Sequence, residues 1–303
     1  TIYEVPLELR RQRLDDVVLD LLQIEAPATD LAEWSRMVER VKNPSSGTVR
    51  IAVVGKYTQL VDAYKSVQQG LIHGGIANDV KVEIGWVSSE SYEAGELEHH
   101  FEGFDGLLIP GGFGDRGIEG MLMAIRWARE NGLPFFGICL GLQCAIIEFA
   151  RTVCGRNDAN SLEFDPDTAD PVICLMDSQR QVTTKGGTMR LGEYAASLRD
   201  GSRVKEVYGD GEIKERHRLR YEVNNEYREL FEKQGLIMSG TSPDDGLVEA
   251  IELPDHPWFI ACQFHPELKS RPTRPHPLFA SFIEAAAAHA KGSHTRAAVG
   301  AQE

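Results

Sequence analysis

The sequence has 303 residues, of which 42% are hydrophobic and 26% are charged, an ordinary composition for a soluble globular protein. A chain of this length can bury a substantial core and predicts one large or two ordinary domains. Its 32 basic and 46 acidic side chains give a formal net charge of −14, which argues against nucleic acid or an anionic membrane as the main partner. No run of 18 apolar residues occurs, so no membrane-spanning helix is expected.

The start of the chain and its cysteines bear on where the protein works. The start of the chain lacks the charged and apolar regions of a secretory leader, so no secretory signal is expected. It also lacks an initiator Met, so we expect a piece cut from a longer chain or, as the alternative, a processed chain. Its five cysteines are an odd number and include no Cys-x-x-Cys pair. This pattern favours reduced thiols, a cytoplasmic location and no structural zinc site.

Residues 1–46 differ from the rest of the chain. Apolar residues recur at helical spacing over residues 6–22, and Asp30 precedes Glu33 by three positions, which is typical of the start of a second helix. The stretch from Asn43 to Gly47 then breaks the chain. We therefore predict a helical interdomain connector that is incomplete as a domain and packs its apolar faces on another part of the protein.

From residue 47 onward, short apolar strands alternate with helices, which predicts βαβ units and a mostly parallel central sheet flanked by helices. The expected strands of this part are residues 49–54, 80–87, 104–109 and 135–138, and the expected helices are residues 62–74, 118–130 and 140–150.

The later part is predicted to be richer in β-structure and to add a smaller β-rich region to the α/β core. The expected strands are residues 172–176, 188–191, 216–223, 236–240, 247–252 and 259–264, the helices 227–233 and 277–290, and the polar loops 157–171 and 177–187. Residues 292–303 lack periodicity and are predicted to be a disordered tail. One α/β domain is thus expected over residues 47–291.

The most specific motif is Gly-Ile-Cys-Leu-Gly at residues 137–141, between a buried strand and a helix. In such a turn, small flanking residues let a strained residue project its side chain at the carboxyl edge of a sheet. The N-terminus of the following helix stabilises a thiolate on Cys139, and the N–H of Leu140 can donate to a developing oxyanion. The motif predicts a nucleophilic cysteine.

A nucleophilic thiol needs a proton carrier, and His265 follows the apolar strand at residues 259–264. Residues two apart in extended chain face the same side, so Glu267 is expected beside the His265 ring as its orienting carboxylate. Cys262 and His265 have a spacing that metal ligands use, but further ligands at useful spacing are lacking. The sequence thus predicts an acid–base pair rather than a metal site.

Pro110-Gly111-Gly112 ends the strand before the nucleophile strand. Glycines at the carboxyl edge of a sheet permit close approach of the backbone to a ligand, and the N–H of Gly112 is a candidate second oxyanion donor. The basic stretch around His217 is expected to be a solvated or ligand-facing edge, and Cys144, Cys154 and Cys174 are expected in the core.

Together these motifs resemble the class I glutamine amidotransferases, and more narrowly the glutaminase domain of the CTP synthase family. The resemblance covers about residues 1–290. The segments that narrow the resemblance to the CTP synthase family are Gly55-Lys56-Tyr57, Asp62-Ala63-Tyr64-Lys65-Ser66-Val67, Pro110-Gly111-Gly112-Phe113-Gly114, Gly187-Thr188-Met189-Arg190-Leu191-Gly192, Arg216-His217-Arg218, Arg220-Tyr221-Glu222-Val223-Asn224 and His256-Pro257-Trp258-Phe259. It implies a flavodoxin-like α/β fold of the class I glutamine amidotransferase type.

The resemblance also implies a reaction. Cys139 attacks the side-chain amide of L-glutamine, His265 protonates the departing ammonia, Glu267 orients His265, and a γ-glutamyl thioester is released as glutamate. No metal site is implied. The glutamine contacts that it implies are Gly112, Leu140, Gly141, Leu142, Gln143, Glu163 and Arg220.

In the family, an amidoligase (synthetase) domain uses the ammonia to aminate UTP to CTP with ATP and Mg²⁺, and GTP activates glutamine hydrolysis allosterically. This chain lacks that domain, so no cofactor is expected in the chain itself. Phe113, Arg116 and the loop near Arg190 are candidates for the GTP response. The whole family enzyme is expected to be a homotetramer and the isolated domain a monomer.

Three other functions remain open from the residues alone. One is a γ-glutamyl peptidase on the same fold, and another is a cysteine variant of the α/β-hydrolases. In that second class the acid precedes the histidine in the chain, unlike Glu267. The third is a catalytically silent module that senses glutamine or GTP, against which the intact set of Cys139, His265 and Glu267 argues.

Overall fold

The computed structural model describes residues 1–92, 96–175, 189–244 and 246–300. Some predictions fall outside this part of the chain. They are the loop at residues 177–187, the last residue of the strand expected at 172–176, the first of the strand expected at 188–191, and residues 301–303 of the tail.

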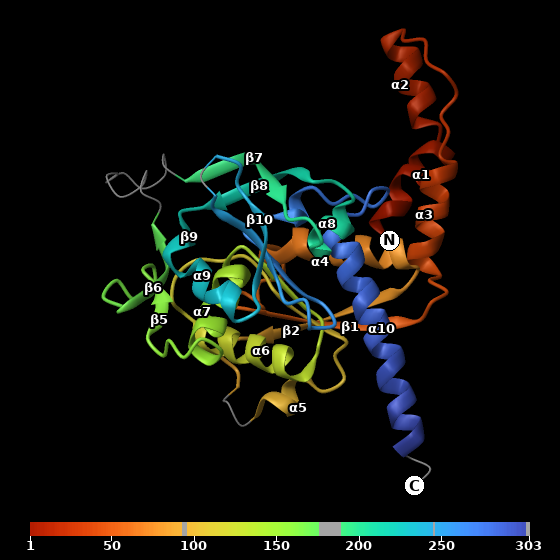
Figure 1. Cartoon of the computed structure of the whole chain (residues 1–303). Coiled ribbons are helices and arrows are strands. Elements are labelled where there is room, and N and C mark those ends of the chain that lie inside the picture. Colours follow the sequence, from red (N-terminus) through yellow and green to blue (C-terminus); the bar gives the residue numbers. More distant parts are fainter. Residues whose placement is uncertain (93–95, 176–188, 245, 301–303) are drawn as a thin grey trace.

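The centre of the fold is a mixed sheet with the strand order β2-β1-β3-β4-β12-β11-β10-β7-β8 over the described residues (Figure 1). The strands from β2 to β12 are parallel, and pairing is antiparallel from β12 to β8. Their bounds are β1 Thr48–Gly55, β2 Lys81–Ser88, β3 Gly106–Ile109, β4 Phe135–Ile138, β7 Arg190–Leu198, β8 Glu212–Leu219, β10 Ile237–Thr241, β11 Val248–Glu252 and β12 Phe259–Cys262. The predicted parallel core is confirmed.

Helices cover both faces of this sheet because its central strands are apolar on both sides. Ala52 and Val54 of β1 pack in one core cluster with α6 and α7, whereas Ile51 and Val53 pack in a second cluster with α4, α8 and α10. Alternate residues of a strand point to opposite faces, so one strand serves both clusters. The bounds are α4 Lys65–Asn78, α6 Ile118–Asn131, α7 Leu140–Thr152, α8 Arg203–Tyr208 and α10 Pro277–Gly300.

A small second sheet lies beside the main one, with the order β5-β6-β9. The single strand expected at residues 216–223 is in fact two strands in different sheets, because β8 ends at Leu219 and β9 begins at Tyr221. Arg220 occupies the corner between them. β5 falls in the segment predicted to be a loop. The bounds are β5 Ala159–Ser161, β6 Asp170–Leu175 and β9 Tyr221–Val223.

Residues 1–46, the predicted connector, are largely helical, as predicted, but the first of the two expected helices is broken. Arg13 adopts a left-handed backbone conformation (φ 61°) between α1 and α2. Only Met37 and Val38 of α3 are buried, against Ile76 of α4. α2 buries no residue and points away from the rest of the molecule (Figure 1). The bounds are α1 Val5–Arg11, α2 Leu14–Leu22 and α3 Ala32–Lys42.

Several other elements differ from the expectation. α10 continues to Gly300, so residues 292–300 are helical where the sequence predicted a disordered tail. This segment continues directly from the alanine-rich part of α10 at residues 285–290, and no proline interrupts it, so the helix extends despite the missing apolar periodicity. Sequence reasoning missed the short helices α5 (Leu97–Phe101) and α8, and it placed the start of α9 (Arg228–Lys233) one residue early.

The basic stretch around His217 is not a solvated edge throughout. The side chain of His217 is fully buried and its Nε2 lies 2.6 Å from Glu249 Oε2. Arg190 is also buried and bonds Glu249 and Glu222. β8 alternates between exposed and buried residues, so Arg216 and Arg218 face outward while His217 joins an ion cluster. Cys144 is buried as expected, whereas Cys154 and Cys174 are partly exposed.

A chain of hydrogen bonds joins the connector to the domain through His73 of α4. His73 Nε2 lies 2.9 Å from Tyr3 Oη, and His73 Nδ1 lies 2.9 Å from Ser270 Oγ. Tyr3 donates its hydroxyl proton to Gln69, so Nε2–H donates to Tyr3 and Nδ1 accepts from Ser270. Burial lowers the pKa of His73 to about 4, and the neutral ring satisfies both contacts.

This arrangement predicts a pH-dependent contribution of His73 to stability. Between about pH 6.5 and pH 4 the unfolded chain binds a proton at His73 that the folded chain excludes, so this contribution is complete above pH 6.5 and falls as the pH drops. His73→Gln should lower the free energy of unfolding at pH 7 by about 1–3 kcal/mol through lost hydrogen bonds and flatten its decline toward pH 4. Urea denaturation at several pH values measures both effects. His99→Gln, at an exposed histidine, is the control, and an unchanged slope in His73→Gln would contradict the prediction.

Candidate active site

Cys139 lies in the sharp turn between β4 and α7, as its motif predicts. Its backbone is in a strained region with φ 52° and ψ −98°, and its side chain is buried. A Cβ at Gly141 would clash with the carbonyl oxygen of Ile109, and one at Gly137 would lie 2.8 Å from the carbonyl of Gly141. Both glycines are therefore required for β3, β4 and α7 to come as close as this turn demands.

Two backbone amides near the thiol can serve as oxyanion donors. Leu140 is the first residue of α7, and Gly112 belongs to the loop after β3. In the described part of the chain neither N–H has a hydrogen-bond acceptor. A Cβ at Gly111 would lie 2.8 Å from His265 Cε1 and 3.6 Å from Cys139 Cβ, so this loop packs directly on the reactive groups.

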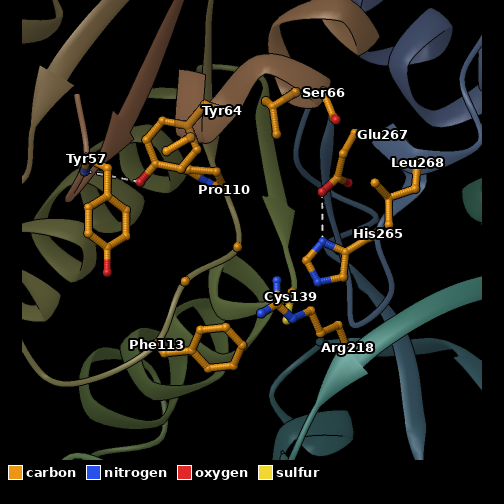
Figure 2. Close-up of a pocket in the computed structure, with 14 residues that line it drawn as sticks. Tyr57, Tyr64, Ser66, Pro110, Phe113, Cys139, Arg218, His265, Glu267 and Leu268 are labelled. Atoms are coloured by element: carbon orange, nitrogen blue, oxygen red, sulfur yellow. Dashed lines mark hydrogen bonds and ion pairs between the residues drawn. The ribbon is translucent and has the colours of Figure 1, made fainter. Parts of the chain in front are cut away.

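His265 and Cys139 meet because β4 and β12 are adjacent parallel strands, with Ile138 paired to Cys262. The Cys139 N–H donates to the Cys262 carbonyl over 2.8 Å. His265 follows β12, and its own N–H donates to the Arg216 carbonyl over 2.7 Å. The two side chains, 126 positions apart in the chain, therefore leave the sheet at the same edge, and the His265 ring lies above Cys139 in Figure 2.

Glu267 lies beside the imidazole of His265, at the position that the sequence predicted. His265 Nδ1 lies 2.7 Å from Glu267 Oε1, and both residues belong to the turn that opens the short 3₁₀ helix Pro266–Leu268. Nε2 is buried, faces Cys139, and has no hydrogen-bond partner among the described residues (Figure 2). The ring thus presents one nitrogen to the carboxylate and the other to the thiol side of the site.

The electrostatics of the site favour a charged imidazole. Burial by itself lowers the pKa of His265, but its interactions with Cys139 and Glu267 outweigh burial and raise the pKa to about 10. His265 is therefore an imidazolium at neutral pH. A cation and a helix N-terminus beside a cysteine sulfur both stabilise the thiolate form of a cysteine.

Gln263 is a further polar contact of Cys139 that the sequence analysis missed. Its Nε2 lies 3.7 Å from Cys139 Sγ, and its Oε1 lies 3.5 Å from Gln143 Nε2. Both glutamines are buried, and Gln143 also donates to the Tyr221 carbonyl over 2.8 Å. In the sequence, the position of Gln263 two residues before His265 is the feature that could have indicated this contact.

Cys139 opens onto a cavity of about 300 Å³, which we call the Arg220 cavity. It brings together Glu163 and Arg220, which are far apart in the sequence and which the resemblance implied as substrate contacts. Glu163 Oε1 accepts from the Gly114 N–H over 2.8 Å. The residues that line the cavity are Gly112, Phe113, Cys139, Gln143, Glu163, Leu219, Arg220 and Tyr221.

A second cavity, of about 390 Å³, also borders Cys139, and we call it the Ser66 cavity (Figure 2). The guanidinium of Arg218 lies 5.7 Å from the centre of the Phe113 ring, and Phe113 is 45% exposed. The labelled residues that line it are Tyr57, Tyr64, Ser66, Pro110, Phe113, Cys139, Arg218, His265, Glu267 and Leu268. Cys139 and Phe113 border both cavities.

Other residues singled out in the sequence lie elsewhere. Gly141 and Leu142 line neither cavity, and the side chain of Leu142 is fully buried in the core. Arg116 packs over the Tyr57 ring at 5.6 Å and binds Glu90. The Arg190 side chain is buried in its ion cluster, so it is not available to a ligand at the surface.

Two general findings concern the described residues as a whole. No group of three or more His, Cys, Asp or Glu side chains within them could hold a metal ion. None of their helices has the length and apolar character needed to cross a membrane.

A sequence model of the class I glutamine amidotransferase family matches residues 59–285, about three quarters of the chain. A CTP synthase of Desulfitobacterium hafniense (strain Y51) is 55% identical over 289 residues, which are 95% of this chain and 54% of the relative. A CTP synthase of Ruminiclostridium cellulolyticum is 56% identical over 285 residues, 94% of this chain and 53% of the relative. The chain thus spans about half the length of these relatives.

A solved structure is also similar. It is the glutaminase domain of Trypanosoma brucei CTPS with bound acivicin, with a TM-score of 0.74 and 42% identity. The match covers 79% of this chain and 94% of that one. The chain therefore belongs to the class I glutamine amidotransferase family and, within it, to the glutaminase domains of the CTP synthase type.

Proposed function

We propose that this chain hydrolyses L-glutamine to glutamate and ammonia through a γ-glutamyl thioester on Cys139. The observation that carries the proposal is the Arg220 cavity, where Cys139 shares one cavity with the acidic Glu163 and the basic Arg220, while the pair of His265 and Glu267 lies beside Cys139 in the Ser66 cavity. A free amino acid carries one ammonium and one carboxylate, so its site needs Glu163 for the first and Arg220 for the second.

The reaction follows from the positions of these groups. The Cys139 thiolate attacks the γ-carbonyl carbon of glutamine, and the N–H groups of Leu140 and Gly112 stabilise the oxyanion that forms. The imidazolium of His265 gives its Nε2 proton to the amide nitrogen, the carbon–nitrogen bond breaks, and ammonia leaves. Neutral His265 then takes a proton from water, which attacks the thioester and releases glutamate and the thiol.

The proposal extends to a partner domain, since the matched relatives are about twice as long as this chain. In the proposed full-length protein, the ammonia passes to an amidoligase domain that aminates UTP to CTP. That domain uses ATP and Mg²⁺. The exposed apolar side chains of α2, such as Val17 (50% exposed) and Leu21 (78%), support a connector that packs on a further part of the protein.

Regulation and assembly complete the proposal. We propose GTP as an allosteric activator, and the exposed Phe113 beside Arg218, with Arg116 over the Tyr57 ring, supports an aromatic and cationic site for a purine nucleotide. The whole enzyme is proposed to be a cytoplasmic homotetramer and this chain by itself a monomer. Five free cysteines accord with a reducing compartment.

A γ-glutamyl peptidase is the second candidate, because the Ser66 cavity leaves room beside Cys139 for a leaving group larger than ammonia. The test is glutamate release from L-glutamine and from γ-glutamylalanine, each with and without GTP. We expect kcat/KM for glutamine to exceed that for the peptide by at least about 100-fold. Turnover of the peptide alone would reject the glutaminase, and turnover of neither would reject both enzymes.

A further inference from the structure

Lys56 is a buried cation next to the active site that the mechanism above does not use. It follows β1 directly, and only 6% of the residue is exposed. It lines neither cavity, so it does not contact a substrate in them. Among the described residues no carboxylate lies within ion-pair distance of its ammonium. Burial lowers the pKa of Lys56, as expected for an ammonium without an ion pair.

The Lys56 ammonium donates its hydrogen bonds to the backbone of the loop after β3. Lys56 Nζ donates to the carbonyl oxygen of Phe113 over 2.9 Å and to that of Gly114. These two peptide units follow Gly112, whose N–H is the proposed second oxyanion donor. An ammonium has three N–H groups and strong hydrogen bonds to carbonyls, so two consecutive peptide units are held by one rigidly placed charge.

The same loop is held from a second direction. Glu163 Oε1 accepts from the Gly114 N–H over 2.8 Å, so Gly114 is bound through its carbonyl by a cation and through its amide by an anion. Lys56 is itself held, because Arg116 donates to the Lys56 carbonyl over 3.3 Å. A glycine-rich loop has little conformational preference of its own, so these contacts restrict the conformations available to Gly112.

From these contacts we propose that Lys56 is a positioning residue for the oxyanion, which holds the loop so that the Gly112 N–H is in place before the substrate arrives. The proposal rests on the thiol acyl-transfer chemistry proposed above. Donors that are preorganised around a developing oxyanion need no reorganisation during the reaction, and loss of one such donor costs roughly 10²–10³ in kcat. Lys56 acts through Gly112 and is not itself a catalytic residue.

The test is Lys56→Met, which keeps much of the aliphatic stem and removes the ammonium. We expect kcat for glutamine to fall by about 10- to 100-fold with KM changed by less than about 3-fold, since the interaction lost is made in the transition state. Lys56→Gln retains a neutral N–H donor and should lose less, and it replaces Lys56→Met if that variant does not fold. Lys81→Met, at a lysine with a 59% exposed side chain on β2, is the matched control and should match the parent.

Two further measurements separate positioning from general damage. Alkylation of Cys139 by iodoacetamide forms no oxyanion, so its rate should be the same in the parent and in the Lys56 variants. A γ-aldehyde analogue of glutamine forms a tetrahedral adduct with the thiol whose oxygen needs the same donors, so it should bind the variants more weakly by about the factor lost in kcat.

Two results would overturn the proposal: unchanged kcat in Lys56→Met, or alkylation that slows in parallel with turnover. Failure of the proposed glutaminase is distinguishable, because it would appear in the parent protein as absent glutamate release from glutamine. In that case the aldehyde affinity and the alkylation rate still test Lys56, since any γ-glutamyl acyl transfer to Cys139 develops the same oxyanion.

Discussion

Replacement of Cys139 by alanine should abolish glutamine hydrolysis, with a loss of at least about 10⁴-fold in kcat. The thioester cannot form without the sulfur, and no other cysteine takes its place in the Arg220 cavity. The fold should persist, because the substitution removes one sulfur atom and leaves the glycines of the turn unchanged. The measurement is glutamate release in a coupled assay, with circular dichroism to confirm folding.

Cys154→Ala is the matched control for this experiment. Burial raises the pKa of the Cys154 thiol to about 11, so it stays protonated and unreactive at neutral pH. It should retain full turnover and should still be modified at Cys139 by a glutamine-like electrophile, as detected by mass analysis. Undiminished turnover in Cys139→Ala would refute the mechanism. An absence of any adduct in the parent protein would favour a silent regulatory module.

Replacement of Glu267 by glutamine should move the alkaline limit of activity to lower pH. The Glu267 carboxylate stabilises the imidazolium of His265, whose pKa is raised to about 10, and a neutral amide at the same position removes the negative charge but keeps an oxygen acceptor. The pKa of His265 should therefore fall toward its usual value near 6.5. Since the leaving ammonia needs the Nε2 proton, the decline of kcat/KM at high pH should begin earlier.

At pH 8 this change should lower kcat/KM by roughly 10- to 100-fold, less than the loss of the nucleophile. The same substitution affects stability in a defined direction. The raised folded-state pKa of His265 contributes stability that is fully present below about pH 6.5 and is lost as the pH rises through about 10. In Glu267→Gln this dependence should shrink.

Profiles of kcat/KM between pH 6 and 10.5, with urea denaturation over the same range, measure both effects. Glu229→Gln, at an exposed carboxylate with an ion pair to Lys233, is the control and should reproduce the parent profile. An alkaline limb that stays in place in Glu267→Gln would show that another group sets it.

Sequence reasoning predicted the fold where the local pattern was strong. Apolar runs identified β3, β4 and β12, and a β-branched run identified β1, because strands that are buried on both faces are mostly apolar. Short elements could not be identified from apolar runs of this kind. β5 has three residues and α8 has six, and elements of this length form only where neighbouring elements supply their contacts. The alternating run at residues 216–223 carries no sign that it changes sheets after Leu219.

The site shows the same difference between features that a local pattern predicts and features that depend on tertiary contacts. The turn around Cys139 and the pair of His265 with Glu267 are local motifs that each span at most five consecutive residues, so the chemistry proposed for them could be predicted from spacing alone. Gln263, Lys56 and His217 could not be assigned in this way. Gln263 and Lys56 directly follow apolar strands, and His217 lies in the charged strand β8. The role of each depends on which distant backbone or side-chain group the fold brings to it.

The amino-acid sequence alone therefore determined the parallel core and the local motifs that carry the proposed nucleophile, acid–base pair and oxyanion loop, because these depend on residue type and on near neighbours in the chain. Only the tertiary structure decided that Ile138 pairs with Cys262, which brings the thiol and the imidazole to one sheet edge. It also decided that Glu163 and Arg220 share a cavity and that Lys56 holds the Gly112 loop. These contacts join residues from strands, corners and loops far apart in the chain, and no local pattern encodes which of them meet.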